Sequence, residues 1–196
     1  MKKENFIMLI VGKKGSGKSY FADKFSMKLK RLLVFDTMRI FDNATPVYSI
    51  KKLEKIVNDI KNNKIIEFRY SIRVNNKYFE YVNSLILSLS NLTYIVDEIQ
   101  VYCNASKIPE NLNVLITEGR HFEINFIFIT QRPARLPIII ITNLDVLIIF
   151  ETQNSRDLDI IESFKYSDID AIKNLKEYQF YCIDLKHKKG YIGKYD

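Results

Sequence analysis

The sequence predicts an α/β protein with a mostly parallel central sheet, helices on both faces and a small β extension at its C-terminal end. Apolar runs rich in β-branched residues alternate with stretches of helical periodicity along the 196 residues. Such alternation is typical of βαβ units. The runs are nearly continuous rather than alternately polar, as expected of strands that are buried on both faces of a parallel sheet.

The elements follow in order along the chain. Residues 6–11 are predicted to form the first strand, and residues 18–31 a helix, because Phe21, Phe25 and Leu29 recur every four positions. The other predicted strands are residues 32–35, 64–68, 92–96, 124–130, 146–150 and 178–185, with 190–195 as a hairpin partner of the last. The other predicted helices are residues 51–62, 78–89, 111–120, 156–164 and 168–174.

Composition narrows the class of protein. A hydrophobic content of 47% is enough for a packed core, and a net charge of +7 permits an anionic partner without showing one. Two cysteines are too few for a disulfide framework. The longest apolar stretch, residues 136–150, is too short and too interrupted to cross a bilayer, so we expect a soluble intracellular protein.

A phosphate-binding loop lies between the first strand and the first helix. Gly12–Ser19 matches G-x-x-x-x-G-K-[ST], and it holds three of the six glycines in the chain. Its N–H groups and the helix N-terminus form an anion cradle, in which Lys18 would reach the β and γ phosphates and the Ser19 hydroxyl would coordinate Mg²⁺. The predicted nucleotide-binding residues are Gly12, Lys13, Lys14, Gly15, Ser16, Gly17, Lys18, Ser19 and Tyr20.

Two acids end a later apolar strand. Asp97 and Glu98 follow Tyr94-Ile95-Val96, at the end of a parallel strand where such sheets bind ligands. Asp97 is predicted to hold Mg²⁺ through its water shell, and Glu98 to orient and polarise the attacking water. A solvated strand end is the alternative reading. A base beside the metal favours hydrolysis over phosphorylation of a small molecule.

Two further residues are candidates for contacting the phosphate that reacts. Gln131 ends the strand at 124–130 and is predicted to contact the γ-phosphate or the attacking water, although it could simply open a loop. Phosphoryl transfer also needs a cation on the transferred group. Arg120 is the preferred arginine finger, acting across a subunit boundary; Arg132 and Arg135 follow, and each could instead be a surface arginine.

Taken in order, these motifs resemble those of the FtsK/HerA superfamily of DNA-pumping ATPases. The resemblance is carried by Gly12–Ser19, Asp97-Glu98, Gly119-Arg120-His121 and Thr130-Gln131-Arg132-Pro133, and it spans roughly residues 5–150. The pairing of glycine-arginine with Gln-Arg-Pro is more specific than the phosphate loop alone. The short chain is most similar to the viral genome-packaging branch, which is little more than a motor core.

The resemblance implies a RecA-like core within one ATPase domain over residues 1–196, with a motor core at about 5–150 and a C-terminal extension at 151–196. It implies ATP and Mg²⁺ as cofactors, and a homo-oligomeric ring, pentamer or hexamer, with ATP at subunit boundaries and an arginine supplied in trans. It also implies duplex DNA in the pore and docking to a capsid vertex or a membrane-associated viral protein, in the host cytoplasm or on the virion. Segments 73–77 and 102–107 could contact DNA, or be plain surface loops.

Three other functions stay open at this point. A phage morphogenesis ATPase of the zonula-occludens-toxin type shares the core but normally carries a membrane segment. A nucleotide-dependent switch would bind ATP with little turnover. A small-molecule kinase would need an arginine-rich lid, and no such cluster stands out.

Overall fold

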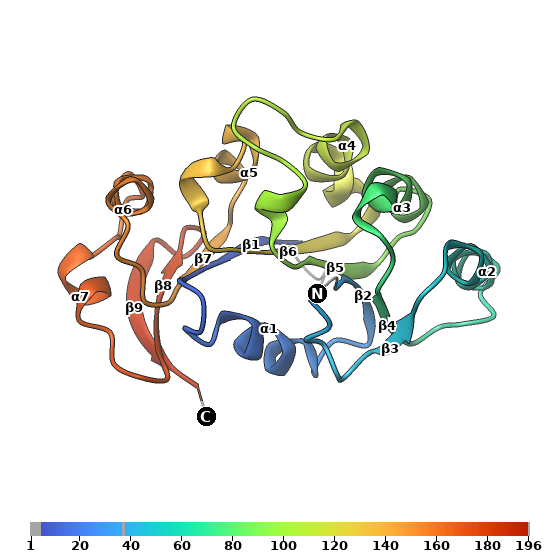
Figure 1. Cartoon of the computed structure of the whole chain (residues 1–196), viewed down its shortest axis with the longest axis horizontal. Helices are drawn as coiled ribbons and strands as arrows, with labels where there is room; N and C mark the ends of the chain where they lie inside the picture. The colour runs from blue at the N-terminus through green and yellow to red at the C-terminus, as the bar shows by residue number, and fades with distance from the viewer. Residues whose placement is uncertain (1–4, 37, 196) are drawn as a thin grey trace.

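The computed structural model describes residues 5–36 and 38–195. Within them, one nine-stranded sheet has the order β3-β4-β2-β5-β6-β1-β7-β8-β9 (Figure 1). The strands β1 to β7 are parallel, whereas β8 and β9 run antiparallel to their neighbours. The strands are β1 (Ile7–Val11), β2 (Arg31–Phe35), β3 (Thr45–Val47), β4 (Phe68–Ile72), β5 (Leu92–Val96), β6 (Ile124–Thr130), β7 (Val146–Ile149), β8 (Gln179–Asp184) and β9 (Lys189–Lys194).

The helices cover the two faces unequally. They are α1 (Lys18–Ser26), α2 (Ile50–Lys61), α3 (Phe79–Ile86), α4 (Glu110–Glu118), α5 (Ile138–Thr142), α6 (Ser155–Glu162) and α7 (Ile169–Lys173). In Figure 1, α2 to α5 lie above the sheet and α1 lies below it. The prediction of helices on both faces is confirmed, and among the described helices α1 alone packs on its face.

Alternate side chains of each strand enter two separate cores. Leu9, Leu33 and Phe128 pack with α2 to α7, while Ile10 and Val34 pack beneath with α1. Every residue of β1 and β5 is buried, which explains why these strands read as continuous apolar runs.

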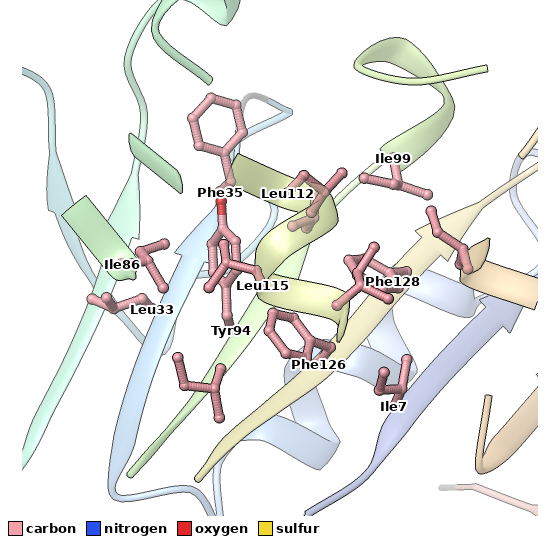
Figure 2. Packing of buried hydrophobic residues seen from close by; sticks show 14 of the residues in the cluster. Ile7, Leu33, Phe35, Ile86, Tyr94, Ile99, Leu112, Leu115, Phe126 and Phe128 are labelled. Atoms are coloured by element: carbon pink, nitrogen blue, oxygen red, sulfur yellow. The ribbon is translucent and has the colours of Figure 1, made fainter. Parts of the chain in front are cut away.

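The larger core contains one polar link. Tyr94 of β5 is fully buried among Leu115, Phe126 and their neighbours (Figure 2). Its hydroxyl donates to Oδ1 of Asn83 on α3, at 3.0 Å. This bond satisfies a hydroxyl that would otherwise be costly to bury, and it ties α3 to the sheet.

One predicted strand is misplaced. We expect a strand at residues 64–68, but β4 begins at Phe68, and Ile66 is 70% exposed. Arg69 and Ser71 interrupt the continuous apolar run by which the other strands were recognised, so β4 was not identified. The Ser71 hydroxyl donates to the Asp36 carboxylate at 2.8 Å, so a tertiary contact explains this polar residue in a buried strand.

Other boundaries also differ. The helix predicted at 18–31 ends at Ser26, and Leu29 reaches the lower core from the turn that follows. Short elements at β3 and α5 were not predicted. In α5 the sequence Ile-Ile-Ile-Ile-Thr favours a strand by local propensity, and tertiary packing overrides it. No helix in the described ranges is long and apolar enough to cross a membrane.

The C-terminal hairpin returns to the start of the chain. β8 pairs with β7 and β9 with β8, as predicted for a C-terminal β extension. Beyond β9, the ring of Tyr195 packs against Phe21 of α1 and against Phe150, with ring centroids 6.0 and 5.5 Å apart. The hairpin therefore places a residue from the end of the chain beside the first loop.

Candidate active site

Three neighbouring strands bring the predicted motifs to one edge of the sheet. The order β5-β6-β1 places the acid pair, the Gln131 segment and the phosphate loop at adjacent carboxyl ends. The prediction that Gln131 follows the strand next to the acid-bearing one is therefore confirmed. Parallel strands bind ligands at this edge because their carboxyl ends and the helix N-termini that follow them meet there.

Backbone geometry explains the loop glycines. Gly15 and Gly17 have φ of +78° and +92°, values that other residues rarely adopt. A Cβ on Gly12 would lie 2.7 Å from the Phe150 Cβ, so a larger residue does not fit. The loop is tied on both sides: Gly12 N–H donates to Thr130 O at 3.3 Å and Lys13 N–H to Glu151 O at 2.9 Å.

The loop side chains have separate environments. Lys18 is 5% exposed, and its Nζ lies 3.7 Å from Oε1 of Glu98. A buried ammonium beside the loop fits the predicted phosphate contact. Lys13 instead forms an ion pair with Glu151, while Lys14 is exposed. Ser19 is half-buried in the first turn of α1, and Tyr20 follows it with 47% exposure.

Asp97 is a fully buried carboxylate, and neither of its oxygens has a hydrogen-bond partner. Burial is the main cause that raises its pKa from 3.8 to about 7; the neighbouring Glu98 and Asp36 carboxylates add to this rise, and the Lys18 ammonium opposes it. Buried oxygens without a donor are what a magnesium ligand offers. The described residues contain no group of three or more His, Cys, Asp or Glu able to hold a metal. Ser19 and Asp97 as the residues that would hold Mg²⁺ stay a prediction.

Glu98 is held by three side chains. Its carboxylate accepts hydrogen bonds from Gln131 Nε2, at 2.7 Å, and from Gln100, and it faces Lys18. Its backbone is left-handed, with φ +50° and ψ +51°, a strained conformation for a non-glycine residue. Strain of this kind is commonly found at functional sites, and here it accompanies the predicted base.

A network not predicted from the sequence fixes residues 130–134, the segment at the end of β6 that carries Gln131. Thr130 Oγ1 donates to Gln100 Oε1 at 2.7 Å, which joins the ends of β5 and β6. Arg132 Nε donates at 2.9 Å to the buried Asp157 of α6, which also accepts from Ala134 N–H at 3.1 Å. Asp157 thus anchors both sides of Pro133. The only local signal was an acid within a predicted helix.

Asp36 lies at the end of β2, as the sequence indicates, and is fully buried. Arg73 pairs with it at 3.1 Å, and the backbone N–H groups of Ile40 and Phe41 donate to the same carboxylate. Arg73, a basic residue of the candidate DNA segment 73–77, is therefore paired within the fold. Tyr102, from the other candidate DNA segment, reaches Asn76 at 3.4 Å, so the two segments lie side by side.

Arg120 lies apart from the other predicted residues. It precedes β6, at the amino edge of the sheet, and Nη2 contacts both Asp145 oxygens at 3.0 and 3.1 Å. The Asp145 carboxylate also accepts the Ile7 N–H at the start of β1. The phosphate loop follows the other end of that strand, so Arg120 does not reach the site within its own subunit. Its action in trans stays a prediction.

The fold and the site define the class: this is a RecA-like P-loop NTPase fold. No protein-family model and no curated protein matches the sequence. Solved structures do. A genome-packaging NTPase, B204 from Sulfolobus turreted icosahedral virus 2, in complex with AMPPCP, superposes with a TM-score of 0.76 at 20% identity, covering 98% of both chains. The resemblance inferred from the motifs is thus confirmed for the fold.

Two other structures share the fold less fully. The N-terminal domain of zonular occludens toxin from Neisseria meningitidis has a TM-score of 0.54 at 17% identity, covering 99% of this chain and 95% of that one. The cytoplasmic domain of the type VII secretion ATPase EccC from Thermomonospora curvata has a TM-score of 0.59 at 16% identity, covering 97% of this chain and 24% of that one.

Proposed function

We propose that the protein is an ATP-hydrolysing motor that translocates double-stranded DNA and packages a viral genome into a capsid. One observation carries the proposal: the phosphate loop, the acid pair and Gln131 meet at three adjacent strand ends, on a fold shared along nearly its whole length with a viral packaging NTPase. Its place of action would be the host cytoplasm or the virion, docked at a capsid vertex or on a membrane-associated viral protein.

The chemistry follows from the side chains. The N–H groups of the loop and the Lys18 ammonium would bind the β and γ phosphates. Ser19 and Asp97 would hold Mg²⁺, which neutralises charge on the phosphates. Glu98 would accept a proton from the attacking water, and Gln131, 2.7 Å from that carboxylate, would orient the same water. The nucleotide phosphates would compete with Glu98 for Lys18, and the Glu98 carboxylate would then lose one of its contacts.

The first test is ATP hydrolysis with and without duplex DNA. Lys18→Ala should lose nucleotide binding. Glu98→Gln should bind ATP normally, since the loop is intact, but hydrolyse it at least about 100-fold more slowly. Lys55→Ala, at an exposed position of α2, is the matched control for loss of a lysine. Full DNA-stimulated turnover in either site variant contradicts the proposal.

The second test concerns the ring. The proposal places Arg120 at the site of a neighbouring subunit in a pentamer or hexamer. Arg120→Ala and Glu98→Gln subunits, each inactive alone, should partly restore hydrolysis when mixed, because some boundaries then contain both wild-type residues. A mass measurement with and without ATP reports the ring. Mixed rings without activity at any ratio refute the assignment to Arg120.

The zonular occludens toxin domain favours a second candidate, a phage morphogenesis ATPase, because it shares the fold over nearly the whole chain. DNA dependence separates the two: a packaging motor hydrolyses ATP faster on duplex DNA and moves along it. A nucleotide switch would complete one turnover and stop, with or without DNA. A phosphorylated small-molecule product would identify a kinase.

A further inference from the structure

A cavity of about 520 Å³ opens beside the phosphate loop. One wall is Gly15, Ser16 and Gly17 of the loop, and Tyr20 extends it. The rest of the lining comes from Glu151, from residues 175–179 at the start of the C-terminal hairpin, and from Tyr195 just beyond its last strand. The cavity is therefore shared between the first loop and the last strands of the chain.

The three tyrosines form a cluster centred on Tyr195. Its ring centroid lies 6.0 Å from that of Tyr20 and 5.8 Å from that of Tyr178. The Tyr195 hydroxyl lies against the loop at Gly17, where an added Cβ would come within 1.9 Å of it. The absence of a side chain at Gly17 thus permits both the left-handed turn and the approach of this ring.

Two of these rings are about half exposed. Tyr20 is 47% exposed and Tyr178 is 52% exposed, although both flank a concave site. Tyr178 also holds a φ of +62°, which is strained for a bulky residue. A strained backbone that presents a half-exposed ring into a cavity is better explained by a ligand than by packing of the hairpin.

The chemistry of the cavity suits a planar aromatic group. Ring faces stack on nucleobases regardless of sequence, because every base has a π-face. The cavity shares Gly15, Ser16 and Gly17 with the anion cradle, so a nucleotide whose phosphates lie in the cradle has its nucleoside within reach of the rings.

We propose that this cavity binds the base of the nucleoside triphosphate, stacked on the tyrosine cluster of Tyr20, Tyr178 and Tyr195. The C-terminal hairpin then supplies part of the nucleotide site within the same subunit. The inference rests on the proposed function, because it takes the ligand of the loop to be a nucleotide.

The test distinguishes binding of the nucleobase from binding of the phosphates. Calorimetric titration with ATP and, separately, with inorganic tripolyphosphate, both with Mg²⁺, compares the wild type with Tyr178→Ala. Loss of one stacked ring should weaken ATP binding about tenfold and leave tripolyphosphate binding unchanged. Tyr48→Ala, which removes an equally large ring that is 60% exposed, is the control and should bind both ligands normally.

Several outcomes overturn the inference. ATP binding unchanged by Tyr178→Ala places the base elsewhere. An equal loss of ATP and tripolyphosphate shows that the hairpin supports the loop rather than the base. If the wild type binds tripolyphosphate as tightly as ATP, the base makes no contact, yet the phosphate cradle stands. If it binds neither, the proposed function fails along with this inference. Unfolding temperatures of all variants distinguish lost contacts from lost folding.

Discussion

Asp97 should make the protein less stable as the pH rises. Its pKa is raised from 3.8 to about 7, mainly by burial. Below pH 4 the carboxyl is protonated in both the folded and unfolded states. Between about pH 4 and 7 the folded state keeps a proton that the unfolded state has lost, so stability falls with pH and levels off above 7. At about 1.4 kcal/mol per unit, a shift of some three units is worth up to about 4 kcal/mol.

Asp97→Asn removes this titration and leaves the shape of the side chain nearly unchanged. We expect it to match the wild type at pH 4 and to exceed its free energy of unfolding by about 2–4 kcal/mol at pH 8. Urea unfolding at intervals of one pH unit, with a chelator present, measures the difference. Asp42→Asn, whose side chain is 90% exposed, controls for loss of a surface charge. The reasoning is refuted if the difference does not change with pH, or if the wild type is the more stable protein at pH 8.

Three further predictions concern other parts of the structure. Asp157→Asn should loosen residues 130–134 and lower kcat roughly 10- to 100-fold, with KM nearly unchanged; an unaltered kcat would show that the anchor is dispensable. Gly15→Ala and Gly17→Ala share the left-handed strain of about 1–2 kcal/mol, but only Gly17→Ala also collides with the C-terminal tyrosine. It should therefore be the less stable of the two in thermal unfolding, and equal losses would argue against the collision. Tyr94→Phe should cost about 1–2 kcal/mol in urea unfolding, because it leaves its amide partner on α3 unpaired; no change would mean that this bond contributes nothing net.

The candidate-site residues whose positions could be predicted belong to motifs that are local in the chain. A strand, a glycine-containing turn and a helix in succession are recognisable within about 20 residues, so the phosphate loop could be found from its own sequence. The strand that ends in Asp97 and Glu98 is equally local. Gln131 could be placed because it follows a clear apolar strand, and the order β5-β6-β1 then brings it to Glu98.

The predictions that failed needed contacts with distant residues. β4 was not recognised as a buried strand because it contains the polar Ser71, whose hydroxyl donates to the Asp36 carboxylate at the end of the neighbouring strand. Nothing near Asp157 signals that it binds the segment after β6. The position of Arg120 at the amino edge, paired with Asp145, also depends on a distant residue; its predicted action in the site of a neighbouring subunit stays a prediction.

The sequence by itself determined the class of fold, the phosphate loop and the acid pair, because hydrophobic periodicity and turn chemistry act between near neighbours in the chain. Only the tertiary structure decided how the sheet orders its strands, which face receives α1 alone, and how Tyr195 meets Gly17. These outcomes depend on packing between segments far apart in the sequence. The energy of each such contact is shared between both partners, and neither partner's local sequence encodes it alone.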